Sequence, residues 1–357
     1  MKKKAVILGI ETSCDETAAS IIQENDTAKP NILSNIVSSQ IDFHKEFGGV
    51  VPELAARSHI EKIDHIVKKA VDESGKNLSE IDAIAVTAGP GLIVCLSVGL
   101  NFAKSLALSL NKPFIAVNHL EGHAISPRLV TELNFPYLLL LISGGHTQFL
   151  SVKKFGKYKR LGTTIDDALG EAFDKTAKMI GIEFPGGPYL EKLAEKGNPN
   201  RFDLPKPILK KGGCNVSFAG LKTAVLKISK IIKNEEDKND LAASFQKTIQ
   251  DILYVKTKNA FKEFKYISRK TKNTFVVAGG VAANRSLRKT LTEVSLENNF
   301  NPIFPPTEFC GDNAAMIAMA GLEKFKLKKF DKLNHPAKPR WPLDDKAIFL
   351  KGAGVKL

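Results

Sequence analysis

Two histidines in this chain have a type and spacing that could support metal chemistry. His119 and His123 are four residues apart in the stretch NHLEGH, residues 118–123. On a helix such residues share one face, with about 5–6 Å between their Cβ atoms, so both imidazoles could reach one ion. The pair therefore predicts two ligands of a metal site. The alternative is that the two histidines only cap or line a helix.

The residues between the histidines bear on what such a metal could do. In zinc peptidases a glutamate follows the first histidine directly and acts as the general base. Leu120 holds that position here, and Glu121 would be rotated from it by about 100° on a helix. A metallopeptidase built on this stretch would therefore have its general base, Glu121, in the wrong position.

A third metal ligand must come from elsewhere in the chain, and Asp312 is the candidate. It stands in the stretch FCGDN, residues 309–313, just before a run rich in alanine and methionine. Its carboxylate would complete a site of two histidines and one carboxylate, a set that suits both iron and zinc. Asp312 could instead be only the N-cap of the helix that follows.

The stretch ISGGHT, residues 142–147, is a candidate anion-binding turn. An apolar strand, Phe135–Ile142, leads into small and hydroxyl residues whose backbone N–H groups could face a phosphate or a developing oxyanion. The same plan of strand, polar turn and strand occurs at Ala5–Ile10, residues 11–17 and Ala18–Ile22. Both turns are therefore expected at comparable places in two similar parts of the fold.

Further polar candidates follow along the chain. Asp166 and Asp167 are expected to begin a helix, because acidic residues favour helix N-termini. Glu171 and Asp174 lie about one turn further on, where they either bind a ligand or form a solvated helix face.

Two glycine-containing stretches could bring a ligand against the backbone. Gly187 lies in FPGGP, residues 184–188, where glycines between prolines allow close approach, although ordinary turn chemistry explains them as well. Asn284 lies in AGGVAANR, residues 278–285, where it could hydrogen-bond to a base edge or a sugar hydroxyl. A helix start is the alternative for this second stretch.

Units of strand, glycines and helix recur and predict the architecture. Ala83–Val86 precedes the helix Ile93–Leu110, and Thr274–Val277 precedes the helix Val281–Val294. Two such units favour an α/β protein of two similar lobes that face one another across a cleft. Apolar spacing predicts further helices at Pro52–Glu73, Asp166–Ile180, Gly187–Lys196, Phe218–Lys233, Leu241–Phe264 and Asn313–Phe325.

Composition limits the class of protein. The 357 residues suit two lobes, no apolar run approaches the ~20 residues of a membrane span, and the start is too short for a signal peptide. The four cysteines are far apart and form no disulfide framework, so a reducing cytosol is expected.

The net charge of the chain, +14, suits binding of a polyanion such as RNA, or it reflects only a lysine-rich surface. The densest basic clusters are Lys153–Arg160, Lys206–Lys211, Lys262–Lys272 and Lys324–Lys332.

Many of these stretches together resemble the TsaD family of bacterial tRNA N6-adenosine threonylcarbamoyltransferases, formerly called O-sialoglycoprotein endopeptidases. Gly311 departs from the hydroxyl residue that the family commonly has there, and residues 215–219 also vary. The stretches that carry the resemblance are ETSCDET (11–17), GGVVPE (48–53), GPGL (89–92), NHLEGH (118–123), SGGHTQ (143–148), DDALGEAFDK (166–175), FPGGP (184–188), GLKTAV (220–225), SFQ (244–246), AGGVAANR (278–285) and RWPLD (340–344).

The resemblance implies a fold and a reaction. The fold would be that of actin-like ATPases and sugar kinases (ASKHA), with a nucleotide cleft. Lobe I would span 1–125, with the C-terminal helix 313–345 returning to it, lobe II would span 126–312 and carry the acyl-adenylate motifs, and 346–357 would be a tail. The enzyme would move a threonylcarbamoyl group from threonylcarbamoyl-adenylate to N6 of the adenosine 3′ of the anticodon (t6A), in tRNAs reading codons that begin with A.

The resemblance also implies site residues and partners. The metal ligands would be His119, His123 and Asp312, holding one divalent ion per subunit, Fe²⁺ or alternatively Zn²⁺. No residue is an evident general base. The partners would be tRNA, a paralogous metal-free subunit (TsaB-like) and a small P-loop ATPase (TsaE-like), in the cytoplasm and without a membrane. The residues matching acyl-adenylate positions are Ile142, Ser143, Gly144, Gly145, His146, Asp174, Gly187 and Asn284.

Three other functions compete with this interpretation. An ATP-dependent small-molecule kinase would share the fold but has no use for the histidine pair. A metallopeptidase lacks its glutamate. An inactive scaffold would be expected to have lost some of the ligand residues, which are intact.

Overall fold

The computed structural model describes residues 3–268 and 273–348, and the chain divides into two compact units. The first unit comprises Met1–Asn134 and Gly311–Asp345, and the second comprises Phe135–Cys310 and Lys346–Leu357. These boundaries differ from the expected 125/126 and 312/313 and place Asp312 in the first unit. Most of the predicted tail, residues 349–357, lies outside the described residues.

The first unit is built on a five-stranded sheet in the order β3-β2-β1-β4-β5. The pairs β1/β2 and β2/β3 are antiparallel, whereas β1/β4 and β4/β5 are parallel. Every residue of β1 and β4 is buried, and most of these residues are apolar. This is expected for strands of a sheet that is covered on both faces. Their bounds are β1 (Val6–Glu11), β2 (Glu16–Gln23), β3 (Asn31–Ser39), β4 (Ala83–Gly89) and β5 (Phe114–Asn118).

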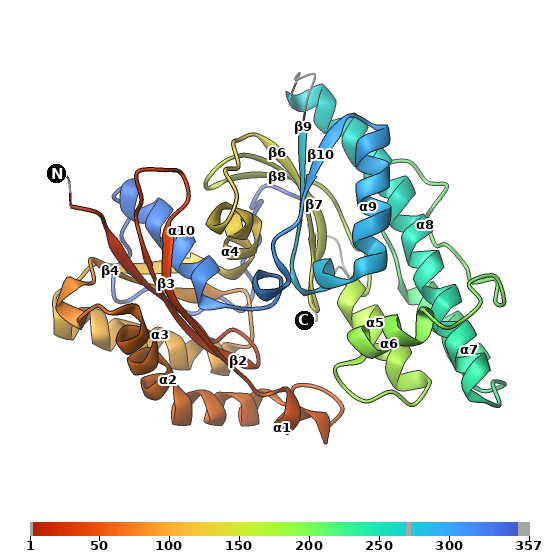
Figure 1. The fold of residues 1–357 in the computed structure, drawn as a ribbon, viewed down its shortest axis with the longest axis horizontal. Helices are drawn as coiled ribbons and strands as arrows, with labels where there is room; N and C mark the ends of the chain where they lie inside the picture. The colour runs from red at the N-terminus through yellow and green to blue at the C-terminus, as the bar shows by residue number, and fades with distance from the viewer. Residues whose placement is uncertain (1–2, 269–272, 349–357) are drawn as a thin grey trace. The chain divides into compact units, whose positions relative to one another are not determined.

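Helices cover both faces of this first sheet. The helices α2 (Pro52–Ser74) and α3 (Ile93–Leu110) pack on one face, and α10 (Ala314–Lys326) packs against β1, β2 and β4 on the other (Figure 1). The short helix α4 (His119–Ile125) follows β5 directly and packs against α10. The remaining short elements are α1 (Ile41–Lys45), η1 (Leu78–Glu80) and η2 (Ser126–Leu129).

The segment after α10 returns across the same unit as a strap. Asp331 pairs with Phe114 at the edge of the sheet, and the Lys338 N–H donates to the carbonyl of Ala88 at 2.7 Å. At the end of the strap, the Asn118 side chain donates to the Trp341 carbonyl at 2.8 Å. This segment is not helical, so the expected helix 313–345 is wrong beyond Lys326.

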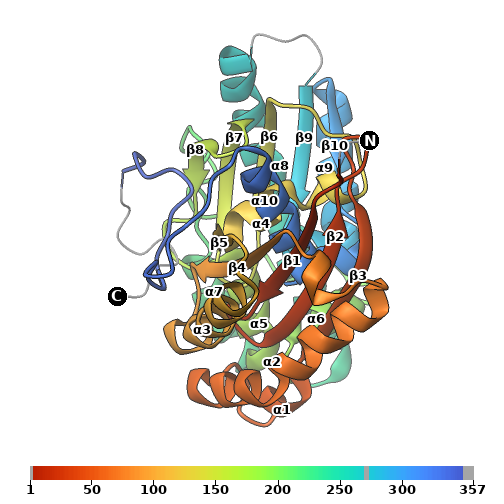
Figure 2. The same ribbon diagram turned by 90° about the vertical axis from the view of Figure 1, so that its left-hand side faces the viewer.

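The second unit repeats the plan of the first. Its sheet has the order β10-β9-β6-β7-β8, seen from right to left in Figure 2, again with one antiparallel meander and two parallel strands. The matching order supports the predicted duplication of two α/β lobes. The strands are β6 (Tyr137–Ile142), β7 (Thr147–Lys154), β8 (Lys157–Thr163), β9 (Asn273–Ala278) and β10 (Phe300–Ile303).

The helices of the second unit differ from the predicted ones mainly at their starts. The segment predicted to begin a helix at Val281 is a 3-10 turn, η3 (Gly280–Ala283), and α9 begins at Arg285 because Asn284 caps it. Asp166 and Asp167 lie in the loop before α5 and not at its N-terminus. The elements are α5 (Leu169–Met179), α6 (Gly186–Ala194), α7 (Ala219–Ser229), α8 (Glu235–Ser268), α9 (Arg285–Glu297) and η4 (Thr307–Phe309).

One helix in the described ranges, α3, is long and apolar enough to cross a membrane by length and composition. It packs against β4 and α2, and a helix that covers a sheet passes the same test.

Candidate functional site

The two histidines are held by a short helix that is fixed at both its start and its side. The Asn118 side chain accepts hydrogen bonds from the N–H groups of Leu120 (2.9 Å) and Glu121 (3.3 Å), which makes it the N-cap of α4. Gly122 faces α10, where an added Cβ would lie 3.0 Å from Ile317. Because α4 packs this closely on α10, the loop that leads into α10 is brought to the histidines.

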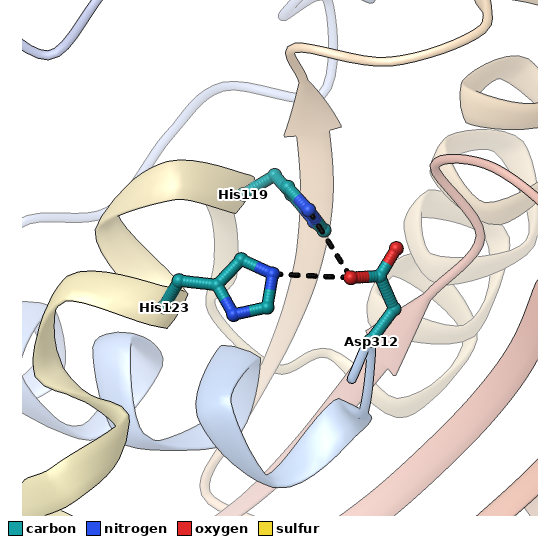
Figure 3. Close-up of side chains that lie close together, drawn as sticks. All are labelled: His119, His123 and Asp312. Carbon is teal, nitrogen blue, oxygen red and sulfur yellow. Dashed lines mark hydrogen bonds and ion pairs between the residues drawn. The ribbon is translucent and has the colours of Figure 1, made fainter. Parts of the chain in front are cut away.

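Asp312, in the loop before α10, lies against both imidazoles. Its Oδ1 is 3.0 Å from His123 Nε2 and 3.5 Å from His119 Nε2 (Figure 3). One ligand atom from each of the three residues lies within 4.8 Å of the others, so the group could hold a metal ion. Asp312 does not cap α10, because the side chain of Asn313 accepts the Met316 N–H at 3.0 Å.

The donor set fits a metal ion. Two ring nitrogens converge on a single carboxylate oxygen, and ligand bonds of about 2.0–2.2 Å are compatible with that convergence. His123 is fully buried, and its Nδ1 has no hydrogen-bond partner among the described residues. Two histidines and one carboxylate leave further coordination positions open.

The surroundings of this group are acidic. Burial alone would lower the pKa of His119, but Asp312 and Glu11 raise it to about 9. Burial raises the pKa of Glu16 well above its usual value, and the nearby Asp312 and Asp15 raise it further. A bound divalent cation would relieve the repulsion between these carboxylates.

The candidate anion-binding turn lies in the second unit, at the end of β6. Because β6 and β9 are parallel, their carboxyl ends, Ile142 and Ala278, lie at the same edge of the sheet, where open α/β sheets commonly bind ligands. The Ser143 N–H donates to the His146 carbonyl at 2.8 Å, which closes the turn. In the described part of the chain, the exposed amides of Gly144 and Gly145 donate to no protein acceptor.

Two other predicted residues lie directly together. The Asp174 carboxylate accepts hydrogen bonds from the N–H groups of Gly186 (3.0 Å) and Gly187 (3.2 Å) at the start of α6. Asp174 is therefore not simply a solvated residue on a helix face. Glu171 instead pairs with Lys175 at 2.6 Å.

Asn284 has a structural role that sequence left open. Its side chain accepts the Leu287 N–H at 2.9 Å as the N-cap of α9, and its amide donates to Gln246 at 3.1 Å. The helix α6 contacts the start of α9, because the Glu191 carboxylate accepts hydrogen bonds from the N–H groups of Arg285 and Ser286. Glu191, in the second half of α6, thus connects this helix to the start of α9.

Comparison with known proteins identifies the family. A family model named TsaD, described as tRNA N6-adenosine threonylcarbamoyltransferase, matches residues 31–319. The chain belongs to the TsaD family. The resemblance seen in the sequence motifs is therefore confirmed.

Relatives of this TsaD-family chain match it over its whole length. A protein of Pelagibacter ubique (strain HTCC1062) is 72% identical over 357 residues, covering all of both chains. A protein of Zymomonas mobilis subsp. mobilis is 52% identical and covers 99% of this chain and 95% of its own. Both carry the name tRNA N6-adenosine threonylcarbamoyltransferase.

Solved structures confirm the fold of this TsaD-family chain. HypF from T. kodakarensis matches with a TM-score of 0.60 at 14% identity, over 92% of this chain and 48% of HypF. Component A of the (R)-2-hydroxyglutaryl-CoA dehydratase from Acidaminococcus fermentans matches with a TM-score of 0.50 at 13% identity, over 90% and 99% of the two chains. The fold is the predicted one of actin-like ATPases and sugar kinases.

The interpretation of the sequence missed one residue that contacts the metal group. Glu11 Oε2 lies 3.0 Å from His119 Nδ1, and the Glu11 side chain is fully buried. The available signal was a carboxylate at the end of an otherwise apolar strand, where burial of a charge requires a partner.

Proposed function

We propose that this chain transfers the threonylcarbamoyl group from threonylcarbamoyl-adenylate to N6 of the adenosine 3′ of the anticodon, in tRNAs reading codons that begin with A. The observation that carries the proposal is the convergence of His119, His123 and Asp312 in a chain of the TsaD family. A kinase would not need this group, and Leu120 stands where a peptidase would have its base.

The donor would be held in the second unit. Gly144 and Gly145 present exposed amides that suit the phosphate of the adenylate or a developing oxyanion. Asn284 and the α6 start at Gly187 would bind the nucleoside part, with Asp174 keeping that helix start in place. The mixed anhydride already contains a good leaving group, AMP, so these residues need mainly to position it for attack.

His119, His123 and Asp312 would hold the metal ion, for which we propose Fe²⁺ with Zn²⁺ as the alternative. A divalent ion bound there would supply Lewis acidity. The buried histidines keep their ligand atoms away from water, and α4 and α10 fix their spacing.

The tRNA would be bound through basic surface. In the loop before α7, Lys206 is paired with Asp251 at 2.7 Å, whereas Lys210 and Lys211 are exposed. Together with the net charge of +14, these side chains suit a polyphosphate partner. We expect the enzyme to act in the cytoplasm with a TsaB-like subunit and a TsaE-like ATPase.

The proposal is tested by reconstitution. The purified chain, both partner proteins and the acyl-adenylate synthase with its substrates are incubated with unmodified tRNA, which is then digested for nucleoside mass spectrometry. We expect threonylcarbamoyl-adenosine from the unmodified chain and from His65→Ala, a control that removes an exposed histidine on α2. We expect none from His119→Ala, with its circular dichroism unchanged.

Two results would contradict the proposal. Absence of product from the unmodified chain, with metal and partners confirmed present, would favour a kinase or a scaffold. Normal product from His119→Ala would remove the metal group from the reaction.

A further inference from the structure

Glu11 binds three groups that come from different parts of the first unit. Its Oε2 accepts the Thr87 hydroxyl at 2.6 Å and lies 3.0 Å from His119 Nδ1. Its Oε1 accepts the Ser13 N–H. Thr87 is on β4, which is parallel to β1, so two neighbouring strands hold the carboxylate in one orientation. The side chain is fully buried.

These contacts determine which nitrogen of His119 would keep its proton when a metal ion binds. A carboxylate is an acceptor, so Nδ1 must donate to Glu11, and Nε2, on the side of Asp312, is the nitrogen left to bind the ion. The Ser13 hydroxyl, 3.2 Å from the same Nδ1, adds a second contact on that side. His123 has no such neighbour, since its Nδ1 is buried without a partner among the described residues.

We infer that Glu11 is a positioning residue for the metal site, which fixes the tautomer and ring orientation of His119 and strengthens it as a ligand. The inference rests on the proposed metal site. Carboxylates that accept the second ring N–H of a ligating histidine typically change metal affinity by about 10–100-fold when they are replaced. Glu11 does not touch the reacting groups in this scheme, so its effect passes through His119.

The first test measures metal affinity. The purified full chain is stripped with a chelator and titrated with Zn²⁺ in competition with a chromophoric chelator. We expect Glu11→Gln to weaken Zn²⁺ binding by about 10–100-fold. The matched control is Asp331→Asn, because Asp331 is a carboxylate of the same unit that accepts the Ala116 N–H at 2.9 Å, on the strand before α4. We expect it to keep the unmodified affinity.

The outcomes separate this inference from the proposed function. Equal Zn²⁺ affinity of Glu11→Gln and the unmodified chain would overturn the role of Glu11 while leaving the metal site intact. Failure of the unmodified chain to bind any Zn²⁺ would overturn the metal site itself. A similar weakening in Asp331→Asn would mean that any lost carboxylate in the unit has this effect, and would also overturn the assignment.

A second measurement needs no variant, in case Glu11→Gln does not fold. Long-range ¹⁵N–¹H correlation spectra of the Zn²⁺-loaded chain report which nitrogen of each histidine is protonated. We expect the proton of His119 on Nδ1. A proton on Nε2, with Nδ1 bound to zinc, would contradict the inference.

Discussion

The Asp174 carboxylate accepts the backbone N–H of Gly187 at 3.2 Å, and so a side chain of α5 caps the N-terminus of α6. The cap residue of α6 itself, Pro185, makes no side-chain hydrogen bond. We expect Asp174→Ala to lower the free energy of unfolding by about 1–2 kcal/mol, because it leaves two helix N–H groups without an acceptor. We expect Asp174→Asn, which keeps an acceptor oxygen, to lose less. Urea denaturation followed by circular dichroism tests this, and equal stability of all three proteins would refute it.

Gly279 follows β9 and packs against the backbone of Ile142, just before the anion-binding turn, and we expect it to tolerate no side chain. Its φ is +97°, and an added Cβ would lie 2.4 Å from the Ile142 carbonyl oxygen. Gly279→Ala should therefore destabilise the chain by more than about 3 kcal/mol, from strain and a backbone clash together. Gly280→Ala is the matched control, because its Cβ would meet no heavy atom within 4 Å, and a change of less than about 1 kcal/mol is expected. Similar losses for the two variants would show that the carbonyl contact does not matter.

His59 should make stability depend on pH. Its Nδ1 is 2.7 Å from the Thr17 hydroxyl, its Nε2 is 3.0 Å from the Cys14 carbonyl, and burial lowers its pKa below the usual 6.5. The unfolded chain therefore binds this proton more readily than the folded chain. The contribution of neutral His59 to the free energy of unfolding is therefore complete above about pH 6.5. It is lost as the pH falls below that value, by at most about 1.4 kcal/mol per pH unit.

The measurement compares two proteins at two pH values. Unfolding free energies from urea denaturation at about pH 7.5 and 5.5 should differ more for the unmodified chain than for His59→Gln, which cannot titrate. An identical pH dependence of the two proteins would exclude His59 as the cause.

Removal of the metal should destabilise the first unit. An ion present at 1,000 times its Kd stabilises the folded state by about 4 kcal/mol, so a chelator should lower the thermal midpoint clearly. His123→Ala should melt at the same temperature with and without metal, because it lacks a ligand. His65→Ala should respond like the unmodified chain, since His65 is exposed on α2. A chelator effect that persists in His123→Ala would place the stabilising ion elsewhere.

Helix spacing and residue type were enough to predict His119 and His123 as a pair, and the structure brings Asp312 to them. The contact with Glu11 could not be predicted in the same way, because it depends on the parallel register of β1 and β4 and on where α4 leaves the sheet. Local signals also failed at Val281, where glycines form a 3-10 turn before the Asn284 cap. The strands β3, β8 and β10 were missed because their sequences lack the apolar runs of β1 and β6, whereas β5 was missed although residues 114–117 are such a run.

The strap that ends beside Asn118 carries Trp341, the one tryptophan of the chain, with the Lys338 ammonium 4.5 Å from its ring centre. All five tyrosines lie between residues 137 and 266, and hence in the second unit. Each unit therefore has its own natural fluorophore. Fluorescence excited selectively at the indole reports on the unit that contains His119 and His123, and tyrosine fluorescence reports on the other unit. The order in which the two units unfold can therefore be observed in the unlabelled protein.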